Sequence, residues 1–219
     1  MGNTEKTRRL VGLSIFTALV IVLQVVAGAI KLGPFSITLT LIPIVVGAAV
    51  YGPAAGAVLG GVFGVVVAAA CITGTDVGGA FLWSLKPFWT VFVVLLKGTL
   101  SGWCAGLVYR ACAGDKFLGF DYDEIQPRAF SDKLKNRRTV LGVVLAAIVC
   151  PVVNTGIFCL AMATVFYDAL LMWADGANLV YYIFIGLVGV NFLVEMGVNV
   201  VLSPAAVRII KAGKRGQNS

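Results

Sequence analysis

The sequence predicts an all-α integral membrane protein, a bundle of six transmembrane helices. Hydrophobic residues make up 59% of the 219-residue chain and charged residues only 12%, whereas soluble domains are about half apolar and about a quarter charged. The apolar residues form long stretches, and a helix needs about 20 such residues to cross a bilayer. We therefore expect a single domain over residues 1–219, embedded in membrane lipid.

The predicted spans follow from the alternation of apolar and polar segments. The first is longer than the apolar core of a secretory signal, so it is expected to be a retained helix. The second is short and contains Pro43, which predicts a tilted or irregular helix. Loops are expected at residues 73–87 and 166–177. The loop 73–87 is either an ordinary interfacial loop or a gate over a pocket. The predicted spans are residues 10–30, 37–50, 54–72, 88–113, 139–165 and 178–210, with one sizeable polar loop at 114–138.

Basic residues are distributed unequally between the two sides of the predicted bundle. Six spans place both termini on the same side as the turn at Tyr51 and the loop 114–138, and this side carries nearly all the Lys and Arg. Because such residues accumulate on the cytoplasmic side, both termini are predicted to be cytoplasmic. The net charge of +7 therefore reports topology rather than nucleic-acid binding.

Polar side chains inside the apolar stretches mark the candidate site. Asn191, Glu195 and Asn199 follow one another at intervals of four residues, which places them on one face of a helix. Lys97 is the only other ionisable residue well inside an apolar stretch, and Asn154 lies in the fifth span. Intramembrane charges usually serve function, so we interpret these five residues as a site for a small polar ligand. Lys97 can pair with a ligand carboxylate or with Glu195; the alternative for the whole group is contact between helices, with Glu195 uncharged.

Several kinds of chemistry are excluded by the residues present. The chain has no histidine, and its five cysteines show no metal-ligand spacing. Nucleotide-binding loops and hydrolase motifs are also missing from the sequence. We therefore predict no metal, no cofactor, no enzymatic activity and no ATP hydrolysis by this chain.

Small residues at intervals of four predict two close helix contacts. Ser14 and Ala18 share a face of the first span, and Gly56, Gly60 and Gly64 share a face of the third. The face with Ser14 and Ala18 serves either packing inside the bundle or docking to a partner membrane protein.

The run from Ile37 to Ile44, which contains Pro43 and leads into Tyr51-Gly-Pro-Ala-Ala-Gly56, resembles the S component of an energy-coupling factor (ECF) transporter. The resemblance covers nearly the whole chain. It implies a six-helix subunit in the plasma membrane of a prokaryote that captures a vitamin from outside. It further implies docking to one membrane coupling protein and two ATPases through an Ala-x-x-x-Ala face on the first helix, where Ser14 here replaces the first alanine.

The chain is most similar to the branch that contains riboflavin and pantothenate carriers. The asparagines of riboflavin carriers on helices five and six are matched by Asn154 and Asn191, but Val194 stands where those carriers typically have lysine. Lys97 suits a carboxylate, which favours pantothenate. The alternatives are a carrier of riboflavin or another vitamin, a stand-alone secondary carrier, and a membrane assembly protein that transports nothing.

Overall fold

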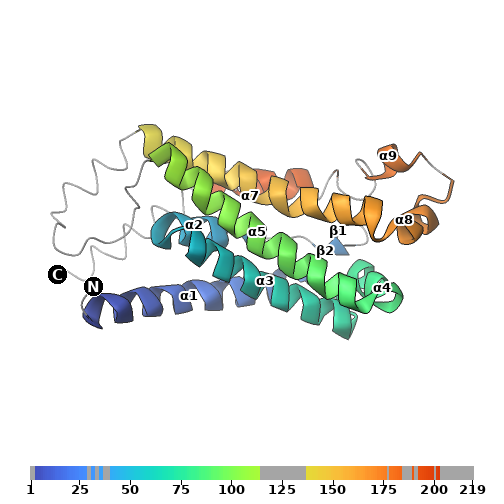
Figure 1. Ribbon diagram of the computed structural model, residues 1–219, viewed down its shortest axis with the longest axis horizontal. Coiled ribbons are helices and arrows are strands. Elements are labelled where there is room, and N and C mark those ends of the chain that lie inside the picture. The colour runs from blue at the N-terminus through green and yellow to red at the C-terminus, as the bar shows by residue number, and fades with distance from the viewer. Residues whose placement is uncertain are drawn as a thin grey trace.

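The described part of the computed structural model is almost entirely helical (Figure 1). The structure describes residues 3–28, 31–32, 35–36, 40–113, 137–176, 178–183, 189, 192–199 and 201–202. Its elements are α1 (Asn3–Gly28), β1 (Lys31–Leu32), β2 (Phe35–Ser36), α2 (Leu41–Tyr51), α3 (Pro53–Thr73), α4 (Val77–Leu85), α5 (Pro87–Ala113), α7 (Arg137–Thr164), α8 (Tyr167–Ala174) and α9 (Leu179–Tyr181). Residues 192–199 are helical as well, and the antiparallel pair β1–β2 is the exception to the helical fold.

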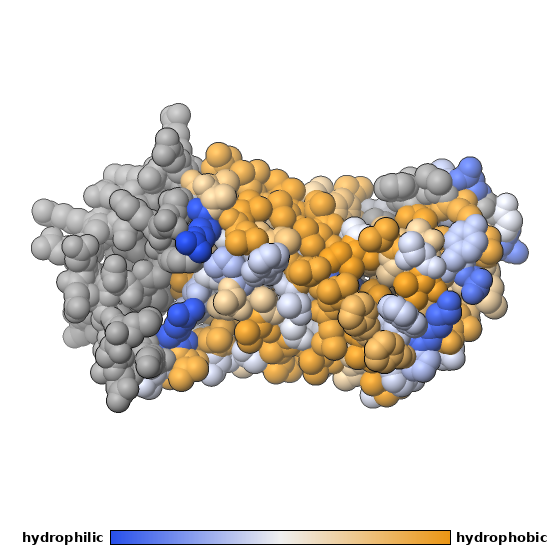
Figure 2. All heavy atoms as spheres, viewed as in Figure 1, coloured by the Kyte–Doolittle hydropathy of each residue, from blue (hydrophilic) through white to orange (hydrophobic). Residues whose placement is uncertain are grey.

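Four of the described helices are long and apolar enough to cross a membrane. Figure 2 shows hydrophobic residues over the middle of the visible face and hydrophilic residues towards its ends. Large apolar side chains are exposed along these helices, among them Ile15, Phe92 and Leu160, which is typical of a surface that meets lipid. The candidate spans are Arg9–Gly28, Pro53–Thr73, Pro87–Cys112 and Val140–Thr164.

Helix α2 is short and lies inside the bundle. It begins at Leu41, so Pro43 falls in its first turn, where the missing N–H of proline removes no helical hydrogen bond. The proline therefore sits at the start of a continuous helix and does not interrupt it. The 11 residues of α2 correspond to about 16 Å at 1.5 Å per residue, well short of the roughly 30 Å hydrocarbon core. Nearly all of them are buried against the neighbouring helices.

Helices α3 and α5 run antiparallel and meet along a seam of glycines. The sequence predicted a close contact for Gly56 and Gly60 but did not identify their partners. A Cβ atom at Gly56 would overlap the carbonyl oxygen of Gly102, and one at Gly60 would overlap that of Gly98. Only glycine lets two backbones approach so closely, so this seam sets the distance between the two helices.

Gly60→Ala is expected to lower the stability of the protein. The added methyl group meets the backbone of α5, and overpacking of this kind costs about 1–3 kcal/mol, against a gain of at most about 1 kcal/mol in helix propensity. Thermal unfolding of the purified protein in detergent measures the difference. The matched control is Gly61→Ala, whose Cβ atom would lie 3.4 Å from the Thr99 hydroxyl; equal melting temperatures for the two variants would contradict the close contact.

Two segments expected to be loops contain short helices, α4 and α8. Leu82 of α4 and Phe166 and Leu170 beside or within α8 are buried in an apolar cluster with residues of α5 and α7. The Phe81 and Trp173 rings, one from each short helix, are 5.3 Å apart. Burial of these apolar side chains supplies the stability that such short helices lack on their own.

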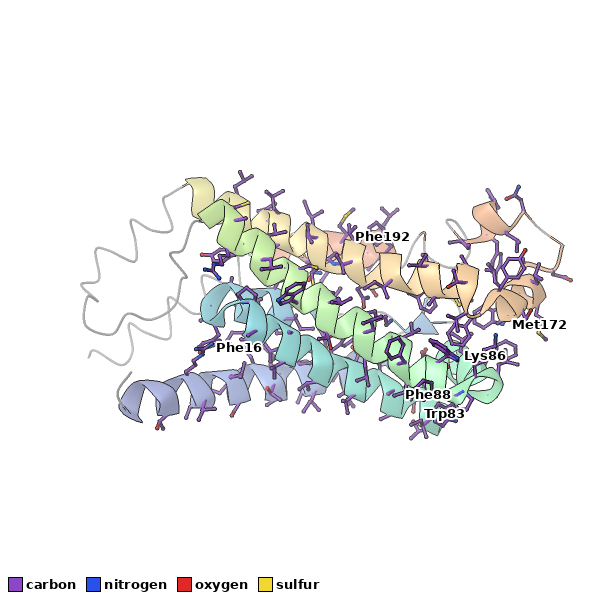
Figure 3. All side chains as sticks on the ribbon, viewed as in Figure 1. Phe16, Trp83, Lys86, Phe88, Met172 and Phe192 are labelled. Atoms are coloured by element: carbon purple, nitrogen blue, oxygen red, sulfur yellow. The ribbon has the colours of Figure 1, made fainter. Side chains whose placement is uncertain are left out.

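Helices α4 and α8 lie at one end of the bundle, which we call the α4/α8 end (Figure 1). Lys86 joins the two helices there, because its Nζ atom donates a hydrogen bond of 2.7 Å to the Val165 carbonyl and lies 3.8 Å from Asp168 Oδ2. In Figure 3, Lys86 and Met172 are found at this end. The opposite end holds the turn between α2 and α3, where the Arg9 guanidinium donates a 3.0 Å hydrogen bond to the Tyr51 carbonyl.

Two predicted segments fall mainly outside the described residues. Of the loop 114–138, the described residues are 137 and 138, which belong to α7. Of the last predicted span, 178–210, the helix 192–199 is the longest described piece. In the view of Figure 3, Phe192, the first residue of that piece, falls beside the middle of α7.

Candidate functional site

Lys97 projects from α5 towards α7. Its side chain is half-buried, and its Nζ atom lies 5.2 Å from the centre of the Phe158 ring on α7. The ammonium is also within electrostatic range of the thiols of Cys71 on α3 and Cys159 on α7. A cation over an aromatic face is weakly stabilised, and the contact with Phe158 does not neutralise the charge of Lys97.

A second polar contact between the same helices lies one turn further along α5. Ser101 is fully buried, and its hydroxyl donates a 2.8 Å hydrogen bond to the Gly98 carbonyl. The Cys150 thiol on α7 is hydrogen-bonded to Ser101 and within electrostatic range of the Glu195 carboxyl. Ser101 and Cys150 thus link α5 and α7.

Asn154 lies on α7 between these two contacts. It is four residues from Cys150 and four from Phe158, so the three side chains share one helix face. Its side chain is only 4% exposed, and its Oδ1 atom has no hydrogen-bond partner among the described residues. Leaving a buried acceptor unpaired costs about 1–3 kcal/mol, which makes Asn154 a candidate for contact with a ligand.

Glu195 and Asn199 are both buried on the helix 192–199, with exposures of 4% and 2%. Their spacing of four residues puts them on one face, and the proximity of Glu195 to Cys150 directs that face towards α7. The Asn199 Nδ2 atom has no hydrogen-bond partner within the described ranges. Asn191, the third residue of the predicted stripe, lies outside the described residues.

The two intramembrane charges do not meet in this structure. Lys97 makes its aromatic contact with Phe158 and forms no ion pair with any carboxylate that the structure describes. Glu195 lies further from the α4/α8 end, within electrostatic range of Cys150. Lys97 was expected to pair either with a ligand carboxylate or with Glu195. The pair with Glu195 does not form in this structure.

The arrangement is therefore a row of polar groups between α5, α7 and the helix 192–199. From the α4/α8 end inwards, the row contains a cation with an aromatic partner, an amide acceptor, and then a hydroxyl, a thiol and a carboxyl. Groups of these kinds can bind a small polar molecule through charge and directed hydrogen bonds. The residues of the row are Lys97, Phe158, Asn154, Ser101, Cys150, Glu195 and Asn199.

Some polar contacts of the bundle could not be predicted from the sequence. Ser101 and Cys150 look like ordinary small residues of a packed helix, and only the pairing of α5 with α7 reveals their contact. A separate buried pair joins α1 to the start of α2, where the Thr40 hydroxyl donates a 3.0 Å hydrogen bond to Gln24 Oε1. Gln24 was detectable as a lone amide in an apolar span, although its partner was not.

The small-residue face of α1 points away from the bundle. Ser14 and Ala18 are both exposed, and the Ser14 hydroxyl bonds back to the Leu10 carbonyl at 2.9 Å. The face that α1 buries carries Val20, Gln24 and Ala27 instead. Two roles were expected for Ser14 and Ala18, packing inside the bundle or docking to a partner membrane protein. In this structure the two residues do not pack inside the bundle.

The four candidate spans indicate a membrane protein, and the internal polar row is its candidate ligand site. Residues 8–207 match the family model described as "ECF transporter, substrate-specific component". The chain belongs to this family, and it is a membrane-embedded substrate-binding subunit of an ECF importer. Comparisons with curated proteins and with solved structures gave no match.

Proposed function

We propose that the protein captures a vitamin from outside the cell and delivers it through an ATP-driven ECF importer. In this proposal the chain has six transmembrane helices in the plasma membrane of a prokaryote, with both termini cytoplasmic and the α4/α8 end facing outwards. The substrate site consists of Lys97, Asn154, Asn191, Glu195 and Asn199. The observation that carries the proposal is the position of Lys97 beside the α7 face that bears the unpaired acceptor Asn154.

The assignment to a partner-dependent importer rests on the family and on the surface of α1. S components have no nucleotide site of their own, so energy comes from two ATPases through a membrane coupling protein. The exposed face with Ser14 and Ala18 supplies the small residues that let a partner helix approach closely. The stand-alone carrier and the assembly protein remain rivals, and each predicts a different outcome in the experiment below.

Pantothenate is the substrate we favour, with riboflavin as the second candidate. A carboxylate near Lys97 would meet a cation that forms no ion pair with any described acidic residue. Riboflavin is favoured by the matching asparagines but disfavoured by Val194.

The test is to identify a ligand on the purified protein. Native mass spectrometry and absorbance of the detergent-solubilised protein should reveal a bound vitamin-sized mass, and a flavin would also colour the sample yellow. An empty protein should be warmed with a panel of vitamins, because ligand at 100 times its Kd stabilises the folded state by about 2.7 kcal/mol. Uptake into vesicles without ATPases would favour a stand-alone carrier. A protein that assembles with partners but binds no small molecule would favour the assembly protein.

A further inference from the structure

We propose that the substrate is a small molecule with a single carboxylate, which binds at Lys97, and with a hydroxyl or N–H donor that binds at Asn154. This inference rests on the proposed capture function and names the chemical class of its substrate. It applies to any vitamin with one carboxylate and excludes an uncharged vitamin such as riboflavin.

The charge of the substrate follows from the surroundings of Lys97. The ammonium is half-buried and faces the Phe158 ring at 5.2 Å, and it forms no ion pair with the acidic residues that the structure describes. Removing a cation from water without an opposite charge is costly. An incoming carboxylate supplies that charge and forms charge-assisted hydrogen bonds, which are about twice as strong as neutral ones.

A single negative charge fits the site better than two. Lys97 is one cation, and Glu195 lies deeper in the same row with an exposure of 4%. A phosphate or a dicarboxylate would bring a second charge that meets no further lysine or arginine among the described residues of the row. That charge would be buried close to a carboxyl group, and like charges in a shared buried site repel.

The donor on the substrate follows from Asn154. Its Oδ1 atom is a buried acceptor that no described residue satisfies. Asn154 lies four residues from Phe158 on α7, so the two positions are about 6 Å apart along the helix at 1.5 Å per residue. A substrate that spans this distance places its carboxylate by Lys97 and a hydroxyl or N–H group by Asn154.

Matched pairs of acids and their uncharged counterparts test the proposal on the full-length protein in detergent. The probes are pantothenate and panthenol, and biotin and biotin amide, with riboflavin as an uncharged vitamin. Binding is measured by calorimetry and by thermal shift. We expect one acid to bind, and its neutral counterpart to bind at least tenfold more weakly.

The preference for the acid must also depend on Lys97. In Lys97→Gln the ratio of the two affinities should fall below about twofold, because the change removes the cation and leaves the rest of the row in place. Lys97→Arg keeps the charge and should retain most of the ratio, which guards against a general loss of folding. Arg110→Gln removes one exposed positive charge from the last turn of the same helix and should keep the full ratio.

The outcomes separate this inference from the capture function. If a neutral probe binds as tightly as its acid, the proposal that the substrate binds through a carboxylate is wrong. The same holds if the preference for the acid persists in Lys97→Gln. Tight binding of riboflavin that is unaffected by Lys97→Gln leaves capture standing and removes this substrate class. No binding by any probe, together with no co-purified small molecule, overturns both.

Discussion

Asn154→Leu should leave the ligand-free protein at least as stable as the wild type and weaken ligand binding at least tenfold. The Asn154 side chain is buried, and its Oδ1 atom has no partner among the described residues. Replacing an unsatisfied polar group by an apolar one of similar size removes a penalty of about 1–3 kcal/mol. In the proposed site, the same change also deprives the substrate of its acceptor. Stability and binding should therefore move in opposite directions, as is common for residues kept for function.

The measurement is a melting temperature without ligand and a Kd for the vitamin that binds the wild type. Val152→Leu is the matched control, because Val152 is exposed on the same helix and should change neither quantity. If Asn154 instead joins helices, Asn154→Leu will lower the melting temperature and leave the affinity of the folded protein unchanged. That result would remove Asn154 from the site.

Ala18→Leu should abolish assembly with the ECF module while leaving ligand binding intact. Ala18 is exposed on α1, on the same face as Ser14, and the larger side chain would hold a partner helix away from the backbone. The polar row lies between α5, α7 and the helix 192–199, so it is not altered by this change. We expect at least tenfold less complex and a matching loss of ATP-dependent uptake.

Co-purification with the coupling protein and the ATPases measures the complex, and calorimetry on the isolated chain measures binding. Val26→Leu also enlarges an exposed apolar side chain of α1, closer to its end at Gly28, and should assemble normally. Full assembly of Ala18→Leu would show that the coupling protein uses another surface. Loss of both assembly and binding would indicate a folding defect instead.

The sequence by itself determined the membrane class, because composition and the length of apolar stretches follow directly from the solvent that the chain must face. It also predicted the close contact of Gly60, which the structure confirms, and a set of candidate site residues, which stay a prediction. Lys97, Asn154 and Glu195 are conspicuous in an apolar stretch, since burying such groups is costly without a reason. The family match over residues 8–207 agrees with the resemblance seen in the sequence, while the substrate branch stays a prediction.

The tertiary structure alone decided which residues meet. Periodicity places a residue on a helix face, but the rotation of that face and the register between two helices depend on packing with the rest of the chain. The partners Gly98 and Gly102 on α5, the contact of Lys97 with Phe158, and the link from Ser101 to Cys150 are all of this kind. Helices α4 and α8 were likewise unpredictable, because short helices form where burial of their apolar side chains outweighs the entropy of ordering them.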